Sequence, residues 1–341
     1  MRRFKRAKDI RVGVVGYGGQ YNMGNSHLIR IQEAGMTPLA VAEIDPKRRR
    51  AAAAEWPGIG VYPSLKEMLK RSAVGLVVVI TPHNTHALLA LEALRGGRHV
   101  VVEKPMAVTT AECDRMIAAA RRKRLLVTTY HNRHWDGCIL RAAREIRAGA
   151  IGRVVRVEAR WGRRGKPESS WRSSRSISGG TLYDWGVHLV EYALQIIDDE
   201  IVEVTGFARN GYWKTRWGAD ANEDEASAVV RFANGVPLTL RVTNLDANPK
   251  PGWVEVTGTE GSYVFDGRGW ELFQRKGDDV RVRRGKNPPH EQKKFYKNVA
   301  NHLVRGTKLV ITPEWARRPI HILDLAVRSA KAGRALKAKY G

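Results

Sequence analysis

Residues 9–130 alternate short segments rich in β-branched residues with longer segments of helical pattern. The strand-like segments are 10–15, 39–43, 60–62, 76–81, 100–103 and 125–129. Helix starts between them are marked by Asp45 before Pro46, and by Thr109 three residues before Glu112. Strands that alternate with helices form parallel sheets covered on both faces. The pattern therefore predicts a doubly wound α/β domain over residues 1–130.

A change of period separates this part from the rest of the chain. Beyond a helix expected at 135–148, the apolar residues Val155, Val157 and Ala159 alternate with charged ones, which is typical of a half-exposed antiparallel strand. Further strand-like segments are 201–208, 226–233, 236–245, 253–256, 262–265 and 280–283. Asn234-Gly235 marks a hairpin, and helices are expected at 290–304 and 313–332. Residues 131–341 are predicted to form an α+β domain with a large open, mainly antiparallel sheet.

Length and composition limit the class of protein. The chain has 341 residues, of which 43% are hydrophobic, enough for two domains with their own cores. No apolar run reaches the roughly 18–20 residues of a membrane span, and no signal-peptide apolar region follows the basic first residues. Cys113 and Cys138 are too few for a disulfide framework or a zinc site. We expect a cytoplasmic protein, without a membrane span, whose cysteines are buried thiols.

The charge of the chain is strongly positive. Lysine and arginine number 59 against 34 aspartates and glutamates, so the formal net charge is +25. Such a charge attracts nucleic acids, anionic membranes or acidic small molecules. The basic residues are spread along the whole chain, and no zinc finger, RRM signature or basic zipper accompanies them. Specific nucleic-acid binding is therefore not expected.

A glycine-rich turn follows the first predicted strand and reads Gly16-Tyr17-Gly18-Gly19-Gln20-Tyr21-Asn22-Met23-Gly24. Glycines at this place let a dinucleotide pyrophosphate approach the backbone at a helix N-terminus. In the spacing G-x-G-x-x-G the third glycine would stand at position 21, which is tyrosine. Either that glycine is replaced, or the loop is three residues longer and Gly24 takes its place.

Glu43 ends the second predicted strand. A carboxylate there accepts hydrogen bonds from the hydroxyls of an adenosine ribose and repels a 2′-phosphate, which favours NAD over NADP. The basic run 47–50 next to it offers the alternative, because it would recruit a phosphate. NAD is the predicted cofactor and NADP the second choice.

Two further strand ends carry polar residues. The fourth strand ends in Thr81-Pro82 and the fifth in Glu103-Lys104-Pro105. Open α/β sheets bind ligands at the carboxyl ends of their strands, so both ends are expected to face one crevice. The proline after Lys104 restricts that residue to extended or turn conformations, which aims its ammonium group into the crevice.

A third group of candidate residues lies in the second domain. Asp184 and His188 are four residues apart on a predicted helix and share a face, with Glu191 one turn further along. An acid next to a histidine orients the ring and tunes it for proton transfer near neutrality. A metal site formed by these three residues is conceivable, but no further ligand cluster supports it. No metal is predicted.

Together these features resemble the Gfo/Idh/MocA oxidoreductase family, which includes glucose-fructose oxidoreductase and inositol dehydrogenase. The resemblance runs from about residue 9 to 338 and also rests on Asn132-Arg133, which follows the last parallel strand. It implies a Rossmann domain with a bound nicotinamide cofactor, and a C-terminal open sheet that forms a homodimer or homotetramer. The expected cofactor-binding residues are Gly16, Gly18, Gly19, Gly24, Glu43, Thr81, Pro82, His86, Glu103, Lys104 and Asn132.

The resemblance implies oxidation or reduction of a secondary alcohol of a sugar, cyclitol or sugar derivative by hydride transfer to or from nicotinamide. Lys104, Asp184 and His188 are the expected catalytic residues, with His188 as general base and Lys104 stabilising the alkoxide. Trp171 offers a flat face to a sugar ring, and Arg172 a charge that suits a sugar acid. The expected substrate-binding residues are Lys104, Arg133, Trp171, Arg172, Asp184 and His188.

The same family covers a second class of activity. In NAD-dependent glycoside hydrolases the cofactor is transiently reduced, returns to its starting state and is never released. An NAD-dependent glycoside hydrolase or epimerase with tightly bound, recycled NAD is therefore the alternative function.

Overall fold

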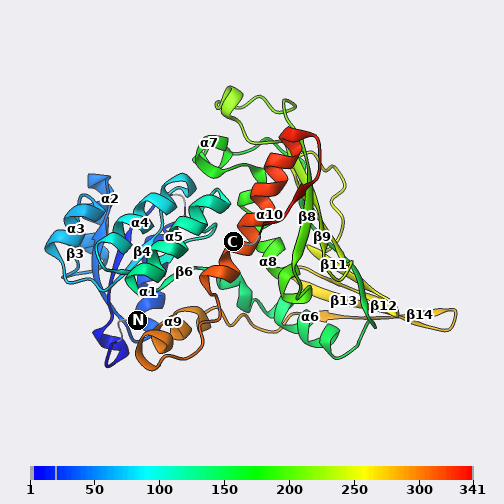
Figure 1. The fold of residues 1–341 in the computed structure, drawn as a ribbon, viewed down its shortest axis with the longest axis horizontal. Coiled ribbons are helices and arrows are strands. Elements are labelled where there is room, and N and C mark those ends of the chain that lie inside the picture. Colours follow the sequence, from blue (N-terminus) through cyan, green and yellow to red (C-terminus); the bar gives the residue numbers. More distant parts are fainter. Residues whose placement is uncertain (1–3, 20, 340–341) are drawn as a thin grey trace. The chain divides into compact units, whose positions relative to one another are not determined.

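The computed structural model describes residues 4–19 and 21–339. The chain forms two compact units (Figure 1). The first comprises the residues up to His131 together with Lys293–Arg318, and the second comprises Asn132–Gln292 and the residues from Pro319 onward. The sequence predicts a single boundary after residue 130, whereas the segment Lys293–Arg318 returns to the first unit.

Within the described residues, the sheet of the first unit has six strands in the order β3-β2-β1-β4-β5-β6, all of them parallel. The predicted doubly wound fold is confirmed, since this order places the topological switch between β1 and β4. The strands are β1 (Arg11–Val15), β2 (Thr37–Ala42), β3 (Gly60–Tyr62), β4 (Leu76–Val79), β5 (His99–Val102) and β6 (Val127–Thr129).

The helices of this unit begin where the sequence predicts them. Asp45 accepts a hydrogen bond from the amide of Lys47 at the start of α2, and Thr109 and Glu112 form a capping box at the start of α5. The helices are α1 (Met23–Glu33), α2 (Pro46–Glu55), α3 (Leu65–Arg71), α4 (His86–Arg95), α5 (Thr110–Lys123) and α9 (Lys294–Arg305). Because β4 and β5 are buried at every residue, their side chains alternate between two covered faces, as parallel strands require.

The second unit is built on a sheet of nine strands, counted over the described residues, in the order β14-β13-β12-β11-β7-β10-β9-β8-β15. The predicted open, mainly antiparallel sheet is confirmed: β7 and β10 are parallel and the other neighbours antiparallel. The strands are β7 (Val154–Gly162), β8 (Ile201–Arg209), β9 (Glu225–Phe232), β10 (Pro237–Thr243), β11 (Val254–Gly258), β12 (Gly261–Phe265), β13 (Gly269–Lys276), β14 (Asp279–Lys286) and β15 (Leu336–Lys337).

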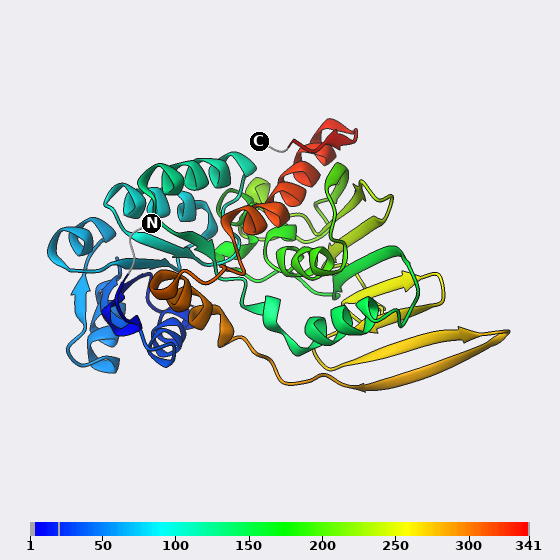
Figure 2. The same ribbon diagram turned by 60° about the horizontal axis from the view of Figure 1, so that its bottom comes forward.

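Helices cover one face of this sheet. α8 packs on β7 and β10, and α6 packs on β12, so the apolar residues that alternate along the strands are buried beneath them. Figure 2 shows β13 and β14 as a long hairpin at one edge of the sheet. The helices are α6 (Gly137–Arg147), α7 (Arg175–Ser178), α8 (Gly186–Ile196) and α10 (Pro313–Ala332), whose first residues belong to the other unit. Over residues 4–19 and 21–339, none of the helices is long and apolar enough to cross a membrane.

Candidate active site

The glycine-rich turn joins β1 to α1 at the carboxyl end of β1. Gly16, Gly18 and Gly19 have φ values of +94°, +95° and +86°, which residues with a side chain rarely adopt. A Cβ atom at Gly16 would also collide with the carbonyl oxygen of Ile80, just beyond β4. Glycine is therefore required here both for the backbone conformation and for the close approach of two strand ends.

Gly24 lies in the first turn of α1 and packs against the same glycine-rich turn. A Cβ atom at Gly24 would stand 2.9 Å from the carbonyl oxygen of Gly16 and 2.9 Å from the Cα of Tyr17. The third glycine of a dinucleotide-binding loop permits this kind of close packing. Of the two alternatives that the sequence leaves open, this geometry supports the longer loop. Gln20, inside the loop, lies outside the described residues.

The carboxylate of Glu43 attaches the glycine-rich turn to the end of β2. Its Oε2 accepts a hydrogen bond of 2.6 Å from the amide of Tyr17, and its Oε1 accepts one of 2.9 Å from the amide of Asp45. Glu43 is buried. Because a carboxylate oxygen accepts more than one hydrogen bond, Glu43 retains capacity for a ribose hydroxyl while it shapes the turn.

Arg48 reaches over the glycine-rich turn from the first turn of α2. Its Cδ stands 3.3 Å from the place of a Cβ on Gly18, and its Nη1 stands 3.5 Å from the place of a Cβ on Gly19. Its Nε lies 3.7 Å from Oδ2 of Asp45. A guanidinium group presents planar donors that suit phosphate oxygens. This cation is therefore placed to meet a phosphate group that approaches the turn.

His86 ties the ends of β4 and β5 together. Its Nε2 lies 2.8 Å from the carbonyl oxygen of Thr81, and its Nδ1 lies 2.7 Å from that of Pro105. Burial lowers the pKa of His86, and the hydrogen bonds to Pro105 and Thr81 oppose that effect. The structure thus gives His86, which the sequence predicts to bind the cofactor, a supporting position with both ring nitrogens facing main-chain carbonyls.

Lys104 follows β5, and its peptide bond to Pro105 is cis. Oε2 of Glu103 accepts a hydrogen bond of 2.8 Å from the amide of Lys104, and Oε1 of Glu103 lies 3.0 Å from Nε2 of His27. Burial raises the pKa of Glu103, but the hydrogen bond from His27, together with the charge of Lys104 and the hydrogen bond from its amide, outweighs that effect and lowers the pKa. Glu103 is therefore an ionised support of the Lys104 backbone, and both of its oxygens are engaged within the chain.

His188 lies in the first turn of α8, and Asp184 lies in the turn that precedes this helix. The prediction that both stand on one helix is wrong, because α8 begins at Gly186 and Trp185 is its cap. The amide of His188 donates to the carbonyl oxygen of Trp185 over 3.0 Å. His188 is buried, and its ring meets the edge of the Trp185 indole at 6.0 Å between ring centres.

Arg172 links Asp184 to Trp171. Its Nε lies 3.9 Å from Oδ1 of Asp184, and its Cζ lies 4.4 Å from the centre of the Trp171 ring. All three side chains are partly exposed. The structure therefore brings three predicted substrate-binding residues into one cluster, with an aromatic face, a cation and a carboxylate. Such groups bind the faces and hydroxyls of a sugar ring.

Arg133 and Asn132 belong to a network around the buried carboxylate of Asp136. Nη1 of Arg133 donates to Oδ2 of Asp136 over 2.9 Å. Oδ2 also accepts from the hydroxyl of Tyr192 over 2.7 Å, and Oδ1 accepts from Nε2 of Gln292 over 2.6 Å. Nδ2 of Asn132 donates to Oε1 of Gln292 over 3.1 Å. Both predicted residues are thus held in fixed places by the second unit itself.

Glu191 pairs with a histidine other than the one the sequence suggests. Its Oε1 is hydrogen-bonded to Nδ1 of His134, and its Oε2 accepts from Nε2 of Gln195 over 3.1 Å. Its carboxylate is buried. Over residues 4–19 and 21–339, no three His, Cys, Asp or Glu side chains are grouped as a metal ion would need.

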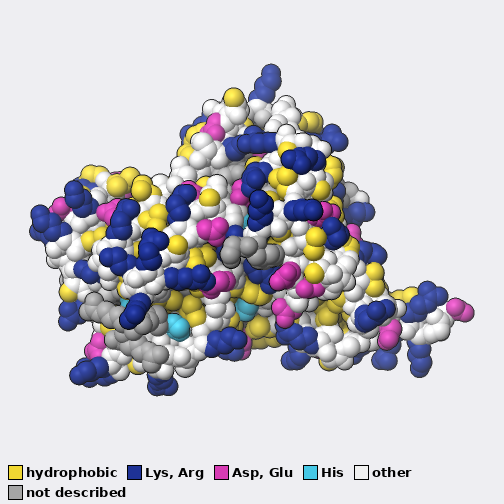
Figure 3. Space-filling model, in the orientation of Figure 1, with side chains coloured by type: hydrophobic (Ala, Val, Ile, Leu, Met, Phe, Trp, Pro, Cys, Tyr) yellow, Lys and Arg dark blue, Asp and Glu magenta, His cyan; other side chains and the backbone are white. Residues whose placement is uncertain are grey.

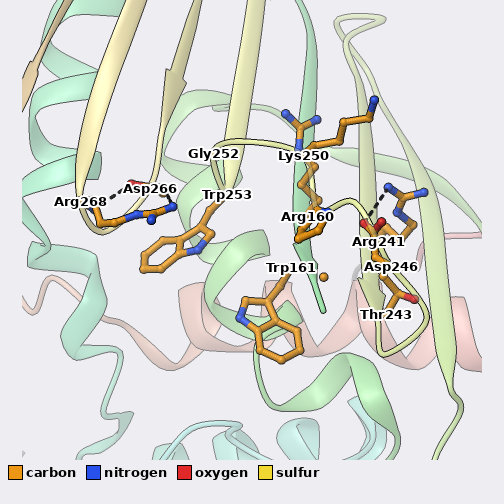
Figure 4. Close-up of a pocket in the computed structure, with 12 residues that line it drawn as sticks. Arg160, Trp161, Arg241, Thr243, Asp246, Lys250, Gly252, Trp253, Asp266 and Arg268 are labelled. Atoms are coloured by element: carbon orange, nitrogen blue, oxygen red, sulfur yellow. Dashed lines mark hydrogen bonds and ion pairs between the residues drawn. The ribbon is translucent and has the colours of Figure 1, made fainter. Parts of the chain in front are cut away.

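A pocket of about 220 Å³ lies beside the end of β7 (Figure 4). The indoles of Trp161 and Trp253 line it, and their ring centres lie 5.9 Å and 5.3 Å from that of Trp185. This cluster of three tryptophans extends from the residue before α8 to the pocket. The polar side chains there are engaged within the chain: Asp246 accepts a hydrogen bond from the amide of Asn248 and pairs with Arg241, and Arg160 pairs with Glu255 on β11.

Two residues that shape the site, His27 and Asp136, escaped the sequence analysis, and Arg48 entered it only as part of the basic run 47–50. Arg48 had a signal, since it stands three residues after the helix cap Asp45 and therefore on the same side of α2. His27 and Asp136 had none. Both are buried. The partners of His27 lie 76 and 269 residues away, and two of the partners of Asp136, Tyr192 and Gln292, lie 56 and 156 residues away.

Two family models match the chain. "Oxidoreductase family, NAD-binding Rossmann fold" matches residues 10–131, and "GFO/IDH/MocA C-terminal domain" matches residues 139–264. The two matches fall on the two sheets described above. They also follow the order in which the sequence presents its motifs.

Several curated proteins are similar in sequence. Levoglucosan dehydrogenase of Pseudarthrobacter phenanthrenivorans is 26% identical, over 76% of this chain and 74% of its own length. Myo-inositol 2-dehydrogenase of Thermotoga maritima is 26% identical, over 75% of each chain. The scyllo-inositol 2-dehydrogenase (NADP(+)) IolW of Bacillus subtilis is 28% identical over 56% of this chain, and the match spans about half of that relative, 53% of its length.

Solved structures share the fold over nearly the whole chain. The putative oxidoreductase YvaA from Bacillus subtilis has a TM-score of 0.86 at 21% identity, covering 99% of this chain and 100% of that one. Levoglucosan dehydrogenase in complex with NADH has a TM-score of 0.82 at 21% identity, covering 97% and 100%. At this level of identity the likeness establishes the fold.

Proposed function

The chain belongs to the Gfo/Idh/MocA family of NAD-binding oxidoreductases, and from this premise we propose that it interconverts a secondary alcohol and a ketone on a sugar, cyclitol or sugar derivative. The observation that carries the proposal is the cradle formed by Gly16, Gly18 and Gly19, into which a side chain would intrude. The dehydrogenases named above for inositols and levoglucosan support the substrate class.

The residues of the cradle fit a dinucleotide. Glycine amides at the N-terminus of α1 suit a pyrophosphate, and Glu43 retains acceptor capacity for a ribose hydroxyl. Thr81, Pro82 and Lys104 stand at the adjoining strand ends, where doubly wound folds hold their ligands. We assign contact with the cofactor to these residues and to Asn132, and assign support of the crevice to His86 and Glu103.

The choice between NAD and NADP depends on two side chains of opposite charge. The buried carboxylate of Glu43 repels a 2′-phosphate, whereas the half-exposed guanidinium of Arg48 attracts one. A charge held in a buried site acts more strongly than one screened by solvent. We therefore assign NAD as the preferred cofactor.

The chemistry follows from where charge develops. A nicotinamide cofactor held by the cradle would supply the acceptor for the hydride of the carbinol carbon. His188 takes the proton of the substrate hydroxyl, and the ammonium of Lys104 stabilises the alkoxide that forms as the O–H bond breaks. Asp184, paired with Arg172, accepts a hydrogen bond from a neighbouring hydroxyl of the substrate and so orients the sugar ring. In the reverse direction the same proton returns from His188 to the new alcohol.

The cluster of Trp171, Arg172 and Asp184 supports a ring-shaped substrate, and the cation of Arg172 suits a sugar acid. The high positive charge fits the same class of small acidic molecule. Figure 3 shows lysine and arginine scattered over the displayed surface, without the continuous basic stripe that nucleic-acid binding favours.

The open face of the second sheet supports an oligomer. Phe207 on β8 and Val229 on β9 are 59% and 42% exposed, and they point to the face opposite α8. Exposed apolar residues on a large sheet favour association with a second copy. We propose a homodimer or homotetramer formed through this face. We also propose a cytoplasmic location, because Cys113 and Cys138 are buried and are not joined in a disulfide.

The test is an absorbance assay for NADH with a panel of neutral and acidic sugars, inositols and levoglucosan, preceded by native mass spectrometry. Steady formation of NADH with one class of sugar supports the dehydrogenase. Altered sugar products without net NADH, on protein that retains NAD, would support the hydrolase or epimerase instead. We expect Lys104→Ala and His188→Ala to lose most turnover while the protein stays folded, and near-normal turnover in either variant would remove that residue from the mechanism.

A further inference from the structure

A continuous chain of hydrogen bonds runs through the first unit from α9 to the amide of Lys104. The hydroxyl of Tyr296 lies 2.6 Å from Nδ1 of His27. Nε2 of His27 lies 3.0 Å from Oε1 of Glu103, and Oε2 of Glu103 accepts from the amide of Lys104 over 2.8 Å. This chain of hydrogen bonds thus joins residues from three separate parts of the sequence. It ends at the backbone amide of Lys104, which is one of the proposed catalytic residues.

The chemistry of the groups fixes the direction of these bonds. An ionised carboxylate only accepts, so Nε2 of His27 must carry the proton that it donates to Glu103. In the neutral ring Nδ1 is then an acceptor, and the hydroxyl of Tyr296 donates to it. Each polar atom in the middle of the chain therefore has a suitable partner, which a buried network requires.

The surroundings of this chain of hydrogen bonds are buried and aromatic. His27 is fully buried and Tyr296 is 2% exposed. The ring of Tyr130 lies 4.4 Å from His27 and 5.5 Å from Tyr296, between ring centres. Phe295 closes the cluster at 4.8 Å from Tyr130. Because these groups are buried, loss of one partner leaves the next polar group without a hydrogen bond, which costs more than it would at an exposed position.

The same chain connects two parts of the proposed cofactor crevice. His27 lies on α1, the helix that begins at the glycine-rich turn, and Glu103 follows β5. Tyr296 lies on α9, in the segment Lys293–Arg318 that returns to the first unit. The distance between the glycine-rich turn and Lys104 is therefore fixed by a bond between side chains, and α9 supports that bond from outside the sheet.

We propose that His27 and Tyr296 are positioning residues for Lys104: they hold the Glu103 carboxylate across the Lys104 amide and so set where the Lys104 ammonium stands. The inference rests on the proposed function in one respect, the catalytic role of Lys104. The hydrogen-bonded chain itself does not depend on which sugar the protein binds.

Charged groups around Glu103 agree with this role. Lys104 and His27 face the carboxylate directly, and His86 on α4 interacts electrostatically with both Glu103 and Lys104. The phenols of Tyr130 and Tyr296 also interact electrostatically with Glu103, and Arg30 on α1 interacts with both phenols. His27 and Lys104 supply the favourable contacts that keep Glu103 ionised despite its burial.

The test compares His27→Leu, His27→Gln and Tyr296→Phe with a matched control. His99 is a buried histidine at the start of β5, the strand that Glu103 follows. Its Nδ1 accepts a hydrogen bond of 2.9 Å from the amide of Leu126. His99→Leu therefore removes a buried ring, its hydrogen bond with Leu126 and its contact with the ring of Phe4, and leaves the hydrogen-bonded chain to Lys104 in place. Unfolding temperatures of all variants show how much each loses in stability alone.

The first measurement reads Lys104 directly and needs no substrate. The full-length variants are labelled with trace acetic anhydride, and the acetylation rate of Lys104 is followed by mass spectrometry against the exposed Lys276. We expect at least a threefold change of the Lys104 rate in His27→Leu, a smaller change in His27→Gln, which keeps a donor for Glu103, and none in His99→Leu. An unchanged rate in His27→Leu and Tyr296→Phe would overturn the proposal.

The second measurement uses the sugar that the NADH assay selects. We expect kcat to fall about 10-fold to 100-fold in His27→Leu, with partial recovery in His27→Gln and with KM for the sugar changed less than threefold. Equal losses of kcat in His27→Leu and His99→Leu would show a purely structural role and refute the positioning. If Lys104→Ala keeps its turnover while the acetylation rates change as expected, the proposed catalysis fails and the positioning of Lys104 stands.

Discussion

The guanidinium of Arg133 lies over the indole of Trp185, with 5.0 Å between its Cζ and the ring centre. Trp185 separates Asp184 from α8, so this contact supports the turn that carries both candidate residues of the second unit. Nη1 of Arg133 is held by Asp136 on its other side. Arg133 therefore helps to hold the turn of Asp184 and Trp185 in place, in addition to any contact that it makes with substrate.

Arg133→Lys keeps the charge but loses the planar group that stacks on Trp185 and donates to Asp136. We expect the unfolding free energy of the second unit to fall by about 1–2 kcal/mol. We also expect KM for the sugar to rise several-fold, because the Asp184 turn is less well held. Chemical unfolding followed by tryptophan fluorescence measures the first effect. A variant as stable as the wild type would show that the contact contributes nothing.

The position of Arg48 over the glycine-rich turn predicts that its side chain raises the affinity for a cofactor with a 2′-phosphate. We expect the wild type to bind NADH more tightly than NADPH, since Glu43 is buried at the ribose end of the cradle. In Arg48→Ala the remaining affinity for NADPH should fall about tenfold, the loss of one charge-assisted contact, while affinity for NADH stays within twofold. Arg50→Ala, on an exposed position of α2, is the control. Tighter binding of NADPH by the wild type would reverse our assignment of the cofactor.

Gly24 tests the longer loop. In Gly24→Ala the new Cβ meets backbone atoms of Gly16 and Tyr17 at 2.9 Å, so α1 must move away from the turn. We expect a loss of about 1–3 kcal/mol in stability and at least a tenfold weaker binding of NADH, measured by fluorescence titration. Gly165→Ala is the control, since a Cβ at that place meets nothing within 4 Å. Unchanged binding in Gly24→Ala would return the role of third glycine to an open question.

Local signals explain which parts of the fold were predictable. The parallel strands of the first unit were found because buried strands read as continuous apolar runs, and because Asp45 and Thr109 mark helix starts. The hairpin of β9 and β10 was found through Gly235, whose φ is +82°. β13 was missed, since its residues mix aromatic and charged side chains and most are partly exposed.

The residues of the candidate site were largely predictable from the sequence, whereas the contacts that hold these residues in place were not. Glycines and strand-end residues carry signals that a short stretch of sequence contains. The return of α9 to the first unit, the pairing of Glu191 with His134 and the bond between His27 and Tyr296 depend on contacts between distant segments. No periodicity or spacing along the chain encodes such contacts.

The ionised state of Glu103 makes the stability of the first unit depend on pH. Its pKa in the folded protein lies below the usual value of 4.5, because the favourable contacts with His27 and Lys104 outweigh the effect of burial. A carboxyl group whose pKa is lowered by folding stabilises the protein above the pKa of the unfolded chain, and this stabilisation is lost as the pH falls through the folded pKa. The wild type should therefore lose stability below about pH 4.5. Glu103→Gln, which resembles the protonated acid, should be less stable than the wild type at pH 7, and the difference should shrink toward pH 3.

Thermal unfolding at pH 7, 5 and 3 measures this difference, and Glu260→Gln at an exposed position is the control. We expect Glu260→Gln to follow the wild type at every pH. When Glu103→Gln is made in the His27→Leu background, it should cost less stability at pH 7 than it does in the wild type. Without the donor of His27 the carboxylate of Glu103 is harder to keep ionised, and its pKa rises. Unfolding curves of Glu103→Gln that run parallel to those of the wild type from pH 7 to pH 3 would mean that Glu103 does not gain from ionisation in the folded state.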